Sequence, residues 1–389
     1  MSLRRIVVVG NGIAGQTACD TLRAAGFDGE LTIAGAENHR TYSRPALSKA
    51  LLHQDQEVQA HLLPEPRHGA TEILGVEAVG LDPEQRVVTL DSGQSLPYDG
   101  LIIASGSRAR RLARRDDTDA SSPELVLRTL DDAIRLKDQI SSKPSVLVIG
   151  GGPLGMEVAS GALHAGCEVT LVSHGIPLAS QLGEHLAGFF RDAATARGLK
   201  LISGGRAEII EQGSSWAVRL ADGTVLEADL LVSAVGDEPN VQWLQGTGLL
   251  DKDALNTDSR GRIRPEIVAA GDVAAFPTAQ GHRRVPLWTS AIDQAKTAAL
   301  GLLHGDGAKE FGSQQYFWTE GFGLSLKVLG QTALTGAPGH LEHGTGENSL
   351  LMHWAHEDGS GTAAALNYRI AVPKLRKLAS AGPQILSGV

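Results

Sequence analysis

The sequence predicts an α/β protein with two parallel-sheet domains, followed by a smaller α+β domain at the C-terminus. A strand, a helix and a second strand are expected within residues 4–34, and the same unit recurs within residues 145–172. Strand–helix–strand units of this kind build parallel sheets. After residue 313 apolar and polar residues alternate, and a short basic helix follows. That alternation is typical of an antiparallel sheet.

Each repeated unit has a clear order of elements. A short apolar run ends in glycine, a helical pattern follows that also ends near a glycine, and a second apolar run closes the unit. Strand-like pieces separated by turn residues follow both units, so the second domain is expected to repeat the first. The expected elements of the two units span residues 4–9, 13–26, 30–34, 145–150, 153–165 and 167–172.

Composition excludes several classes of protein. The chain has 389 residues, of which 42% are hydrophobic and 20% charged, as in ordinary globular proteins. Its net charge of −9 argues against general binding of nucleic acids. No apolar run approaches the length of a membrane span. The only cysteines, Cys19 and Cys167, cannot form a disulfide framework, so we expect a protein of the reducing cytoplasm.

The first glycine-rich turn predicts a dinucleotide site. Residues 10–15 read Gly-Asn-Gly-Ile-Ala-Gly and lie between a strand and a helix. Gly10 and Gly12 permit a tight turn and a close approach to a pyrophosphate, and Gly15 allows the helix to pack on the strand. Glu37 ends the second strand, where a carboxylate can bind ribose hydroxyls.

A second turn of the same kind predicts a second dinucleotide. Residues 150–155 read Gly-Gly-Gly-Pro-Leu-Gly, again between strand and helix. Two such sites in one chain favour electron transfer between a flavin and a nicotinamide. Glu157 is expected on the first turn of this helix, where it could also simply complement the helix dipole.

The end of the next strand bears on the choice of nicotinamide. A carboxylate there would bind the ribose of NAD and repel a 2′-phosphate, but the residues are Ser173 and His174. Both side chains could accept a phosphate, yet no arginine lies beside them. The sequence leaves NADH and NADPH open.

A third segment also fits a flavin site. Residues 267–272 form an apolar strand that ends in Gly271 and Asp272. Asp272 could bind a ribityl hydroxyl, or it could be an ordinary turn residue. The helix expected over residues 290–303 could place its positive N-terminal end near negative charge on the flavin.

These motifs together resemble the ferredoxin and rubredoxin reductases that supply electrons to oxygenases and to cytochromes of the P-450 type. The most specific match is residues 42–49, YSRPALSK, which is similar to the RPPLSK-like signature of that family. Residues 104–107 resemble its A-T-G-x strand end, and residues 127–129 its L-R-T. Residues 236–240 resemble its G-x-x-P-N turn, and residues 316–319 its F-W-S signature.

The resemblance implies a glutathione-reductase-like fold and two cofactors, FAD and NADH or NADPH. It pairs Lys49 with Glu157 close to flavin N5 and brings Trp318 near the flavin, and we take these three as the catalytic residues. The residues expected to bind FAD are Gly10, Gly12, Ile13, Ala14, Gly15, Glu37, Arg44, Pro45, Lys49, Val76, Ala104, Ser105, Gly106, Arg128, Asp272 and Trp288. Those expected to bind the nicotinamide cofactor are Gly150, Gly152, Pro153, Leu154, Gly155, Ser173, His174 and Gly236.

The chain also departs from the family pattern. Disulfide reductases carry redox cysteines in the region of residues 42–49, and this chain has none there. The family commonly has Glu, Ser, Trp and Asn before the last flavin helix, where this chain has Pro286-Leu287-Trp288-Thr289-Ser290. The F-W-S-D-Q of the family becomes Trp318-Thr319-Glu320-Gly321.

The resemblance implies an electron-transfer enzyme: hydride passes from NAD(P)H to FAD, and single electrons pass to a [2Fe–2S]-type ferredoxin. An acidic ferredoxin, or a rubredoxin, could dock on basic residues, which are dense at 108–115 and again at 374–377. The run at 108–115 could equally be a solvated loop. The alternative function is a flavoenzyme that reduces or oxidises a small molecule without a protein acceptor. We expect no metal, and a monomer or a weak homodimer.

Three domains are expected. The FAD-binding domain is discontinuous and comprises residues 1–116 and 241–312. The NAD(P)H-binding domain comprises residues 117–240, after a polar linker at 112–123, and the C-terminal α+β domain comprises residues 313–389.

Overall fold

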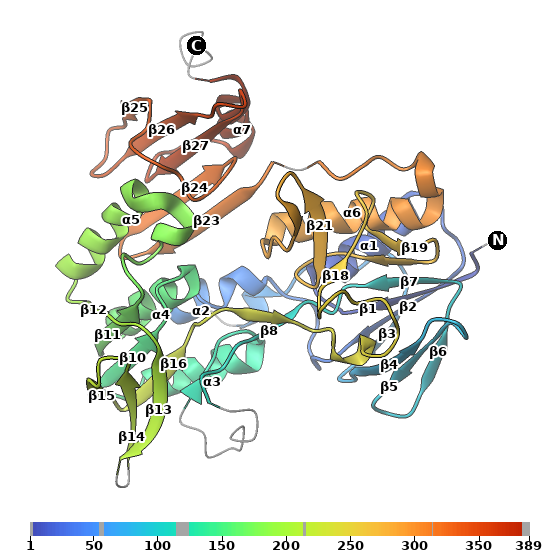
Figure 1. The fold of residues 1–389 in the computed structure, drawn as a ribbon, viewed down its shortest axis with the longest axis horizontal. Coiled ribbons are helices and arrows are strands. Elements are labelled where there is room, and N and C mark those ends of the chain that lie inside the picture. Colours follow the sequence, from blue (N-terminus) through green and yellow to red (C-terminus); the bar gives the residue numbers. More distant parts are fainter. Residues whose placement is uncertain (1–2, 54–57, 114–123, 213–214, 313, 383–389) are drawn as a thin grey trace. The chain divides into compact units, whose positions relative to one another are not determined.

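The chain divides into two structural units in a computed structural model (Figure 1). The structure describes residues 3–53, 58–113, 124–212, 215–312 and 314–382. Unit 1 comprises residues 1–43, 59–108 and 238–313. Unit 2 comprises residues 44–58, 109–237 and 314–389. The chain passes between the units within η2 (Val58–His61), β8 (Ser107–Ala109) and β17 (Asp237–Pro239), and also after residues 43 and 313.

Unit 1 is built on a six-stranded sheet in the order β19-β20-β7-β1-β2-β3. All neighbouring strands are parallel except β19 and β20. Two small three-stranded sheets, β4-β5-β6 and β18-β21-β22, accompany it. The strands are β1 (Arg5–Val9), β2 (Glu30–Gly35), β3 (Thr71–Leu74), β4 (Ala78–Asp82), β5 (Val87–Leu90), β6 (Ser95–Pro97), β7 (Gly100–Ile103), β18 (Leu255–Asn256), β19 (Arg262–Arg264), β20 (Ile267–Ala269), β21 (Ala274–Thr278) and β22 (Gly281–Arg283).

The main sheet of unit 1 is buried on both faces, as its unbroken apolar strands require. Ile6 and Val8 face helices α1 (Ile13–Ala24) and α6 (Trp288–His304), which pack against each other. Val7 and Val9 face a second core, made with β4–β6 and the short helix η4 (Gln242–Leu244). The 3₁₀ turn η5 (Gly305–Gly307) follows α6.

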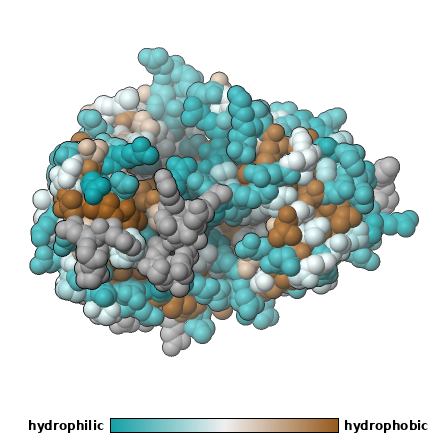
Figure 2. Space-filling model, turned by 60° about the horizontal axis from the view of Figure 1, so that its bottom comes forward, coloured by the Kyte–Doolittle hydropathy of each residue, from teal (hydrophilic) through white to brown (hydrophobic). Residues whose placement is uncertain are grey.

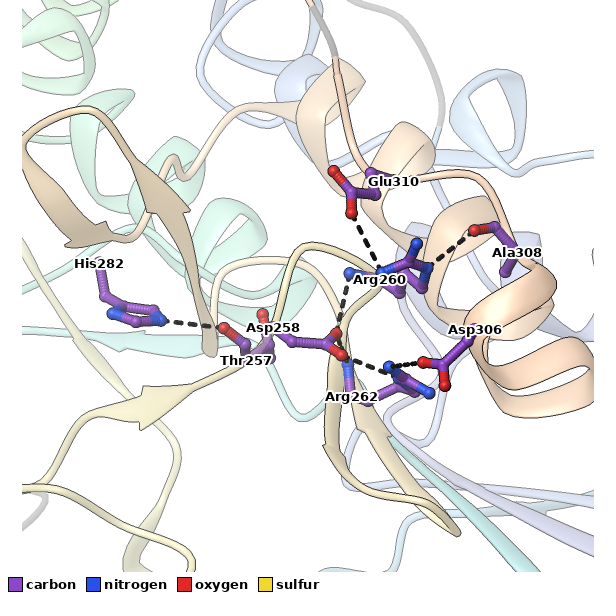
Figure 3. Close-up of polar contacts among 8 residues, drawn as sticks. All are labelled: Thr257, Asp258, Arg260, Arg262, His282, Asp306, Ala308 and Glu310. Carbon is purple, nitrogen blue, oxygen red and sulfur yellow. Dashed lines mark hydrogen bonds and ion pairs between the residues drawn. The ribbon is translucent and has the colours of Figure 1, made fainter.

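A network of ion pairs fixes the segment before β19 to the end of α6 (Figure 3). Asp258 accepts hydrogen bonds from the backbone of Arg260 and Arg262 and pairs with the Arg262 guanidinium at 2.8 Å. Arg262 also pairs with Asp306 at 2.7 Å, just after α6. Burial alone would raise the pKa of Asp258, but these hydrogen bonds outweigh it and lower the pKa.

Unit 2 contains a five-stranded parallel sheet in the order β12-β11-β10-β16-β9. Between β12 and β16 the chain forms a three-stranded antiparallel sheet, β13-β14-β15. The strands are β9 (Glu124–Leu125), β10 (Ser145–Ile149), β11 (Glu168–Ser173), β12 (Lys200–Ser203), β13 (Ala207–Gln212), β14 (Ser215–Leu220), β15 (Val225–Glu227) and β16 (Leu230–Ser233). The helices are η1 (Arg44–Ala46), α2 (Ala50–His53), α3 (Leu130–Ile140), α4 (Pro153–His164) and α5 (Ala179–Ala196).

The C-terminal part of unit 2 is an antiparallel sheet in the order β23-β24-β27-β26-β25. Its strands are β23 (Tyr316–Gly321), β24 (Leu324–Leu329), β25 (His340–His343), β26 (Leu350–Ala355) and β27 (Gly361–Leu366). Leu375 and Leu378 bury one side of α7 (Val372–Ala381) against this sheet. The predicted α/β class, both strand–helix–strand units and the C-terminal sheet with its basic helix are therefore confirmed.

The assignment of three domains stays a prediction. The segment 44–58, which we assigned to the FAD-binding domain by its position in the sequence, belongs to unit 2 with the second parallel sheet and the C-terminal sheet. Most of the expected linker, residues 114–123, lies outside the described residues.

The surface face in Figure 2 is mostly hydrophilic, with apolar side chains in separate patches. Among the described residues, no helix is long and apolar enough to cross a membrane.

Candidate functional site

The first glycine turn of unit 1 has the form that a pyrophosphate needs. A β-carbon on Gly10 would lie 2.0 Å from the carbonyl oxygen of Ala104, and one on Gly15 would lie 1.9 Å from the carbonyl oxygen of Gly10. Both glycines are therefore required by packing inside the protein. Gly12 differs, because no described atom lies within 4 Å of the place its β-carbon would take. This open position at the N-cap of α1 leaves room for a ligand at the helix N-terminus.

The electrostatics of this turn also favour an anion. The first turn of α1, residues 13–16, carries no carboxylate. The N–H groups of Ile13, Ala14 and Gly15 precede the first α-helical hydrogen bond, which Gln16 donates to Gly12. They point along the helix axis toward the open position, where the helix dipole stabilises negative charge.

Glu37 lies two residues after β2 and is held beside the turn. Its carboxylate accepts a hydrogen bond from the Tyr42 hydroxyl at 2.5 Å. The next residue back along this loop, Thr41, donates to the carbonyl oxygen of Asn11 at 3.0 Å. The loop that carries Glu37 is therefore tied to the glycine turn, as a ribose-binding carboxylate must be.

Two further segments end at the same edge of the sheet, because β7, β20, β1 and β2 are parallel neighbours. After β7, Ser105 exchanges two hydrogen bonds with Asn240: the Ser105 hydroxyl donates at 2.8 Å, and the Asn240 amide donates at 2.9 Å. After β20, Gly271 adopts φ +80° and packs against Ala14, which directs the chain into Asp272. Carboxyl ends of parallel strands are where such sheets bind ligands.

The remaining residues predicted to bind FAD lie in both units. In unit 1, the backbone of Val76 donates to Gly35 at the end of β2, and Trp288 is the first residue of α6. In unit 2, the Arg44 guanidinium donates to the carbonyl oxygen of Arg128 at 2.5 Å, and Pro45 follows in η1. Arg128 itself precedes the capping box that Thr129 and Asp132 form at α3.

The second glycine turn, in unit 2, repeats the first. A β-carbon on Gly150 would lie 2.2 Å from the carbonyl oxygen of Ala234, and one on Gly155 would lie 1.9 Å from that of Gly150. Gly152 is open within 4 Å among the described atoms and caps α4, which begins at Pro153 and Leu154.

Of the other residues predicted to bind the nicotinamide cofactor, the structure places Ser173 beside the second turn. A β-carbon on Gly151 would lie 2.2 Å from Ser173 Oγ, so Ser173 lies against this turn, while His174 is exposed. Gly236, with φ +108°, accepts a hydrogen bond from the backbone of Arg110.

The structure brings the three predicted catalytic residues together within unit 2. Lys49 Nζ lies 2.9 Å from Glu157 Oε1, and the two side chains are 15% and 5% exposed. The same ammonium lies 5.8 Å from the centre of the Trp318 ring, within the range of a cation–π contact. Lys49 is therefore a largely buried, paired lysine rather than a solvated surface residue.

One detail of the sequence prediction was wrong. Glu157 is the fifth residue of α4 and lies beyond its first turn. Its carboxylate is buried and turned to Lys49, so complementing the helix dipole is not its role. The helix itself starts at Pro153, as predicted, because proline is favoured at the first helical position.

Sequence reasoning assigned no role to Ser48 and Thr319. The Ser48 hydroxyl donates to Glu157 Oε2, and the Thr319 hydroxyl donates to Glu157 Oε1 at 2.6 Å. Both residues lie inside the segments that carried the family resemblance, directly before Lys49 and directly after Trp318. That adjacency was the available signal.

The two cysteines are buried in the protein core. Burial raises the pKa of the Cys19 thiol to about 12, and burial also raises the pKa of Cys167. Raising the pKa of a thiol lowers its thiolate fraction at neutral pH, so neither cysteine is suited to redox exchange. In the part of the chain that the structure describes, no group of three or more His, Cys, Asp or Glu side chains could hold a metal ion.

The predicted basic regions differ in their surroundings. Arg108 pairs with Glu238, and Arg111 donates to the carbonyl oxygen of Glu124, so part of the first run supports the structure. Arg114 and Arg115 lie outside the described residues. On α7, by contrast, three basic side chains are exposed, namely Lys374, Arg376 and Lys377.

The sequence pattern of the pyridine nucleotide-disulphide oxidoreductases matches residues 4–295 of this chain. The chain belongs to that family. It is 33% identical over 357 residues to rhodocoxin reductase of Rhodococcus erythropolis, covering 89% of this chain and 82% of the relative. It is 31% identical over 337 residues to the ferredoxin–NAD(+) reductase component of the p-cumate 2,3-dioxygenase system of Pseudomonas putida, covering 85% and 82%.

A solved structure supports the same relationship. The ferredoxin reductase for the CYP199A2 system from Rhodopseudomonas palustris superimposes with a TM-score of 0.83 and 28% identity. The match covers 94% of this chain and 91% of the other. This family member therefore has the fold that the resemblance implied, and it is an oxidoreductase.

Proposed function

We propose that this protein is an FAD-dependent NAD(P)H:ferredoxin oxidoreductase that takes hydride from NAD(P)H and delivers single electrons to a ferredoxin of an oxygenase system. One observation carries the proposal: the chain has two glycine turns at helix N-termini. Gly12 caps α1 and Gly152 caps α4, and each leaves space beside the turn for a ligand. Two dinucleotide sites in one chain suit a flavin and a nicotinamide. The name of the relative from Pseudomonas putida, a ferredoxin–NAD(+) reductase component, supports the acceptor.

FAD, when bound, supplies the chemistry that converts a two-electron donor into two one-electron steps. The protein supplies binding and charge. The N–H groups at the start of α1 bind the pyrophosphate, Glu37 binds ribose hydroxyls, and Asp272 orients the ribityl chain. The turn at 150–155 binds the pyrophosphate of the nicotinamide cofactor in the same way.

Lys49 supplies the positive charge that stabilises electron density arriving on the flavin. Glu157 holds that ammonium at 2.9 Å, and Trp318 covers it. No cysteine relay is involved, because segment 42–49 carries no cysteine and both thiols of the chain are buried. With both cofactors bound, hydride would pass between them without a thiol of the protein as relay.

The finer features of the partner are also part of the proposal. The ferredoxin is acidic and docks on the basic side of α7, where Lys374, Arg376 and Lys377 are exposed. A protein with two buried free thiols suits the reducing cytoplasm. A monomer or weak homodimer stays a prediction.

A reconstituted assay tests the function. The purified chain should be yellow, with roughly one FAD per chain, because it has a single FAD site, at the glycine turn of unit 1. With NAD(P)H, a [2Fe–2S] ferredoxin and cytochrome c, cytochrome reduction should require the ferredoxin. A chain that binds no FAD would contradict the proposal. Fast turnover of a small quinone with no ferredoxin able to accept electrons would instead support a small-molecule flavoenzyme.

A further inference from the structure

The Glu157 carboxylate joins three separate segments of unit 2. Its Oε1 pairs with Lys49 at 2.9 Å and accepts the Thr319 hydroxyl at 2.6 Å, while its Oε2 accepts the Ser48 hydroxyl. Lys49 and Ser48 lie in the segment 44–58, Glu157 lies on α4, and Thr319 lies on β23. Both oxygens of this buried carboxylate are therefore occupied by donors.

The number of donors matters because a carboxylate with one partner can rotate. Two hydroxyl donors on different oxygens fix the carboxylate plane, and this fixes the direction in which it can hold a cation. A lysine ammonium is a point charge on a flexible stem and does not select a direction by itself. Its other close neighbours are weak partners: the carbonyl oxygen of Pro45 lies at 3.5 Å, and the Trp318 ring lies at 5.8 Å.

We propose that Thr319 and Ser48 are positioning residues, which hold Glu157 so that the Lys49 ammonium keeps one orientation. The C-terminal sheet thereby contributes to the reaction indirectly: Thr319 on β23 is uncharged, and it acts by holding Glu157. The consequence for catalysis rests on the proposed function, whereas the consequence for Lys49 does not.

This proposal can be tested by substitution at Thr319, because other contacts also hold β23 against α4. Thr319 is not its only link to α4: the backbone of Phe322 donates to Ser160 Oγ at 2.8 Å, one turn further along the helix. Gly321 also packs there, since its β-carbon would lie 3.4 Å from Ser160 Cβ. Loss of the Thr319 hydroxyl should leave β23 in place.

The first experiment uses the protein without added nicotinamide or acceptor. Thr319→Val and Ser48→Ala remove one hydroxyl each, and Thr319→Ser keeps it. Thr362→Val is the matched control, because Thr362 is also fully buried in the C-terminal sheet and donates to the carbonyl oxygen of Gln331 at 2.8 Å. The readout is the rate of reductive methylation of Lys49 by formaldehyde with an amine–borane as reductant, followed by peptide mass spectrometry on the protein as purified.

Methylation of Lys49 should accelerate several-fold in Thr319→Val and in Ser48→Ala, because the ammonium leaves its fixed position more often. It should match wild type in Thr319→Ser and in Thr362→Val. If Thr319→Val methylates at the control rate, or if Thr319→Ser is as fast as Thr319→Val, the positioning role is wrong. Should Thr319→Val not fold, Ser48→Ala and Thr319→Ser decide the same question.

The second experiment measures hydride transfer in the FAD-loaded enzyme by stopped flow. Thr319→Val should lower kcat about tenfold with the KM for NAD(P)H changed by less than about twofold, the pattern of a contact made mainly in the transition state. Thr319→Ser should restore the rate. An effect confined to KM would overturn the proposal. If wild type itself does not oxidise NAD(P)H, the proposed function fails, and the methylation result still decides the positioning role.

Discussion

Ser173 packs directly against Gly151, where a β-carbon would lie only 2.2 Å from Ser173 Oγ. The end of β11 and the second glycine turn are thus in contact, and a residue at 173 meets whatever binds at that turn. Pro177 is also close, with its Cα 3.2 Å from the place of the same β-carbon. A carboxylate at this strand end selects NADH in other dinucleotide sites, and this chain has a hydroxyl instead.

Ser173→Glu should therefore shift the cofactor preference toward NADH. The new carboxylate can bind ribose hydroxyls, and it repels a 2′-phosphate. We expect the ratio of kcat/KM for NADH over NADPH to rise about tenfold or more, from added repulsion and lost phosphate contacts. Steady-state kinetics with both cofactors measure the ratio. His174→Gln is a suitable comparison variant, because His174 is the next residue along the chain and its side chain is exposed. An unchanged ratio in Ser173→Glu would mean that another part of the site distinguishes the cofactors.

Direct hydride transfer predicts that both cysteines can be removed. Cys19 and Cys167 are buried, and burial raises the pKa of each thiol. The double variant Cys19→Ala, Cys167→Ala should lose some stability from the two small cavities, roughly 1–2 kcal/mol in total. Its NAD(P)H oxidation rate per bound FAD should stay within about twofold of wild type, because no thiol takes part in the chemistry. A folded, FAD-loaded double variant that does not turn over would contradict direct transfer.

Local sequence patterns predicted much of this structure. Both strand–helix–strand units follow from apolar runs that end in glycine, and Gly10 and Gly150 adopt positive φ at the places where the pattern requires a tight turn. The pairing of Lys49 with Glu157 came from the family resemblance. It could not have come from spacing, because the two residues are more than a hundred positions apart.

Other features depend on tertiary packing that no local pattern records. The register of β23 decides that Thr319 faces α4 while Trp318 faces Lys49. The departures Glu320 and Gly321 also become understandable only in three dimensions. Glu320 is exposed on the strand, and Gly321 is close to Ser160, so a small residue suits that position. We have no comparable structural reason for Pro286 before α6.

The C-terminal sheet should lose stability as the pH falls. His353 on β26 lies opposite His340 on β25, and the residue is only 5% exposed. Burial, and then the neighbouring His340 and His356, lower the pKa of His353 below its ordinary value of 6.5. The folded state therefore holds this ring neutral, and the unfolded state binds a proton more readily. Stability from this residue is present above pH 6.5 and declines as the pH falls through that value toward the lowered pKa.

Urea unfolding at pH 7, 6 and 5, followed by Trp fluorescence, measures this effect. His353→Gln should be less sensitive to pH than wild type over this interval, because the titrating ring is gone. The slope can differ by at most about 1.4 kcal/mol per pH unit for one proton. His343→Gln, an exposed histidine of the same sheet, should keep the slope of wild type. Equal slopes in wild type and His353→Gln would show that other groups govern the acid sensitivity.

The basic side of α7 should speed the encounter with an acidic ferredoxin. Lys374, Arg376 and Lys377 are exposed, while Leu375 and Leu378 hold the helix on the sheet. Replacing the three basic residues with glutamine leaves the buried side of α7 intact. The rate of cytochrome c reduction through ferredoxin should fall several-fold at low ionic strength, and its dependence on salt should flatten, since surface attraction is screened within about 10 Å at 0.1 M salt.

Two controls make this last result specific. Reduction of a neutral quinone needs no docking, so its rate should not change in the triple variant. A second triple variant neutralises basic residues that pair with neighbouring acids in the same unit: Arg191, Lys200 and Arg219. It should keep both the ferredoxin rate and the salt dependence of wild type. If the two triple variants lose ferredoxin activity equally, only the overall charge matters and α7 is not the docking surface. If neither loses any, the acceptor binds elsewhere on the protein.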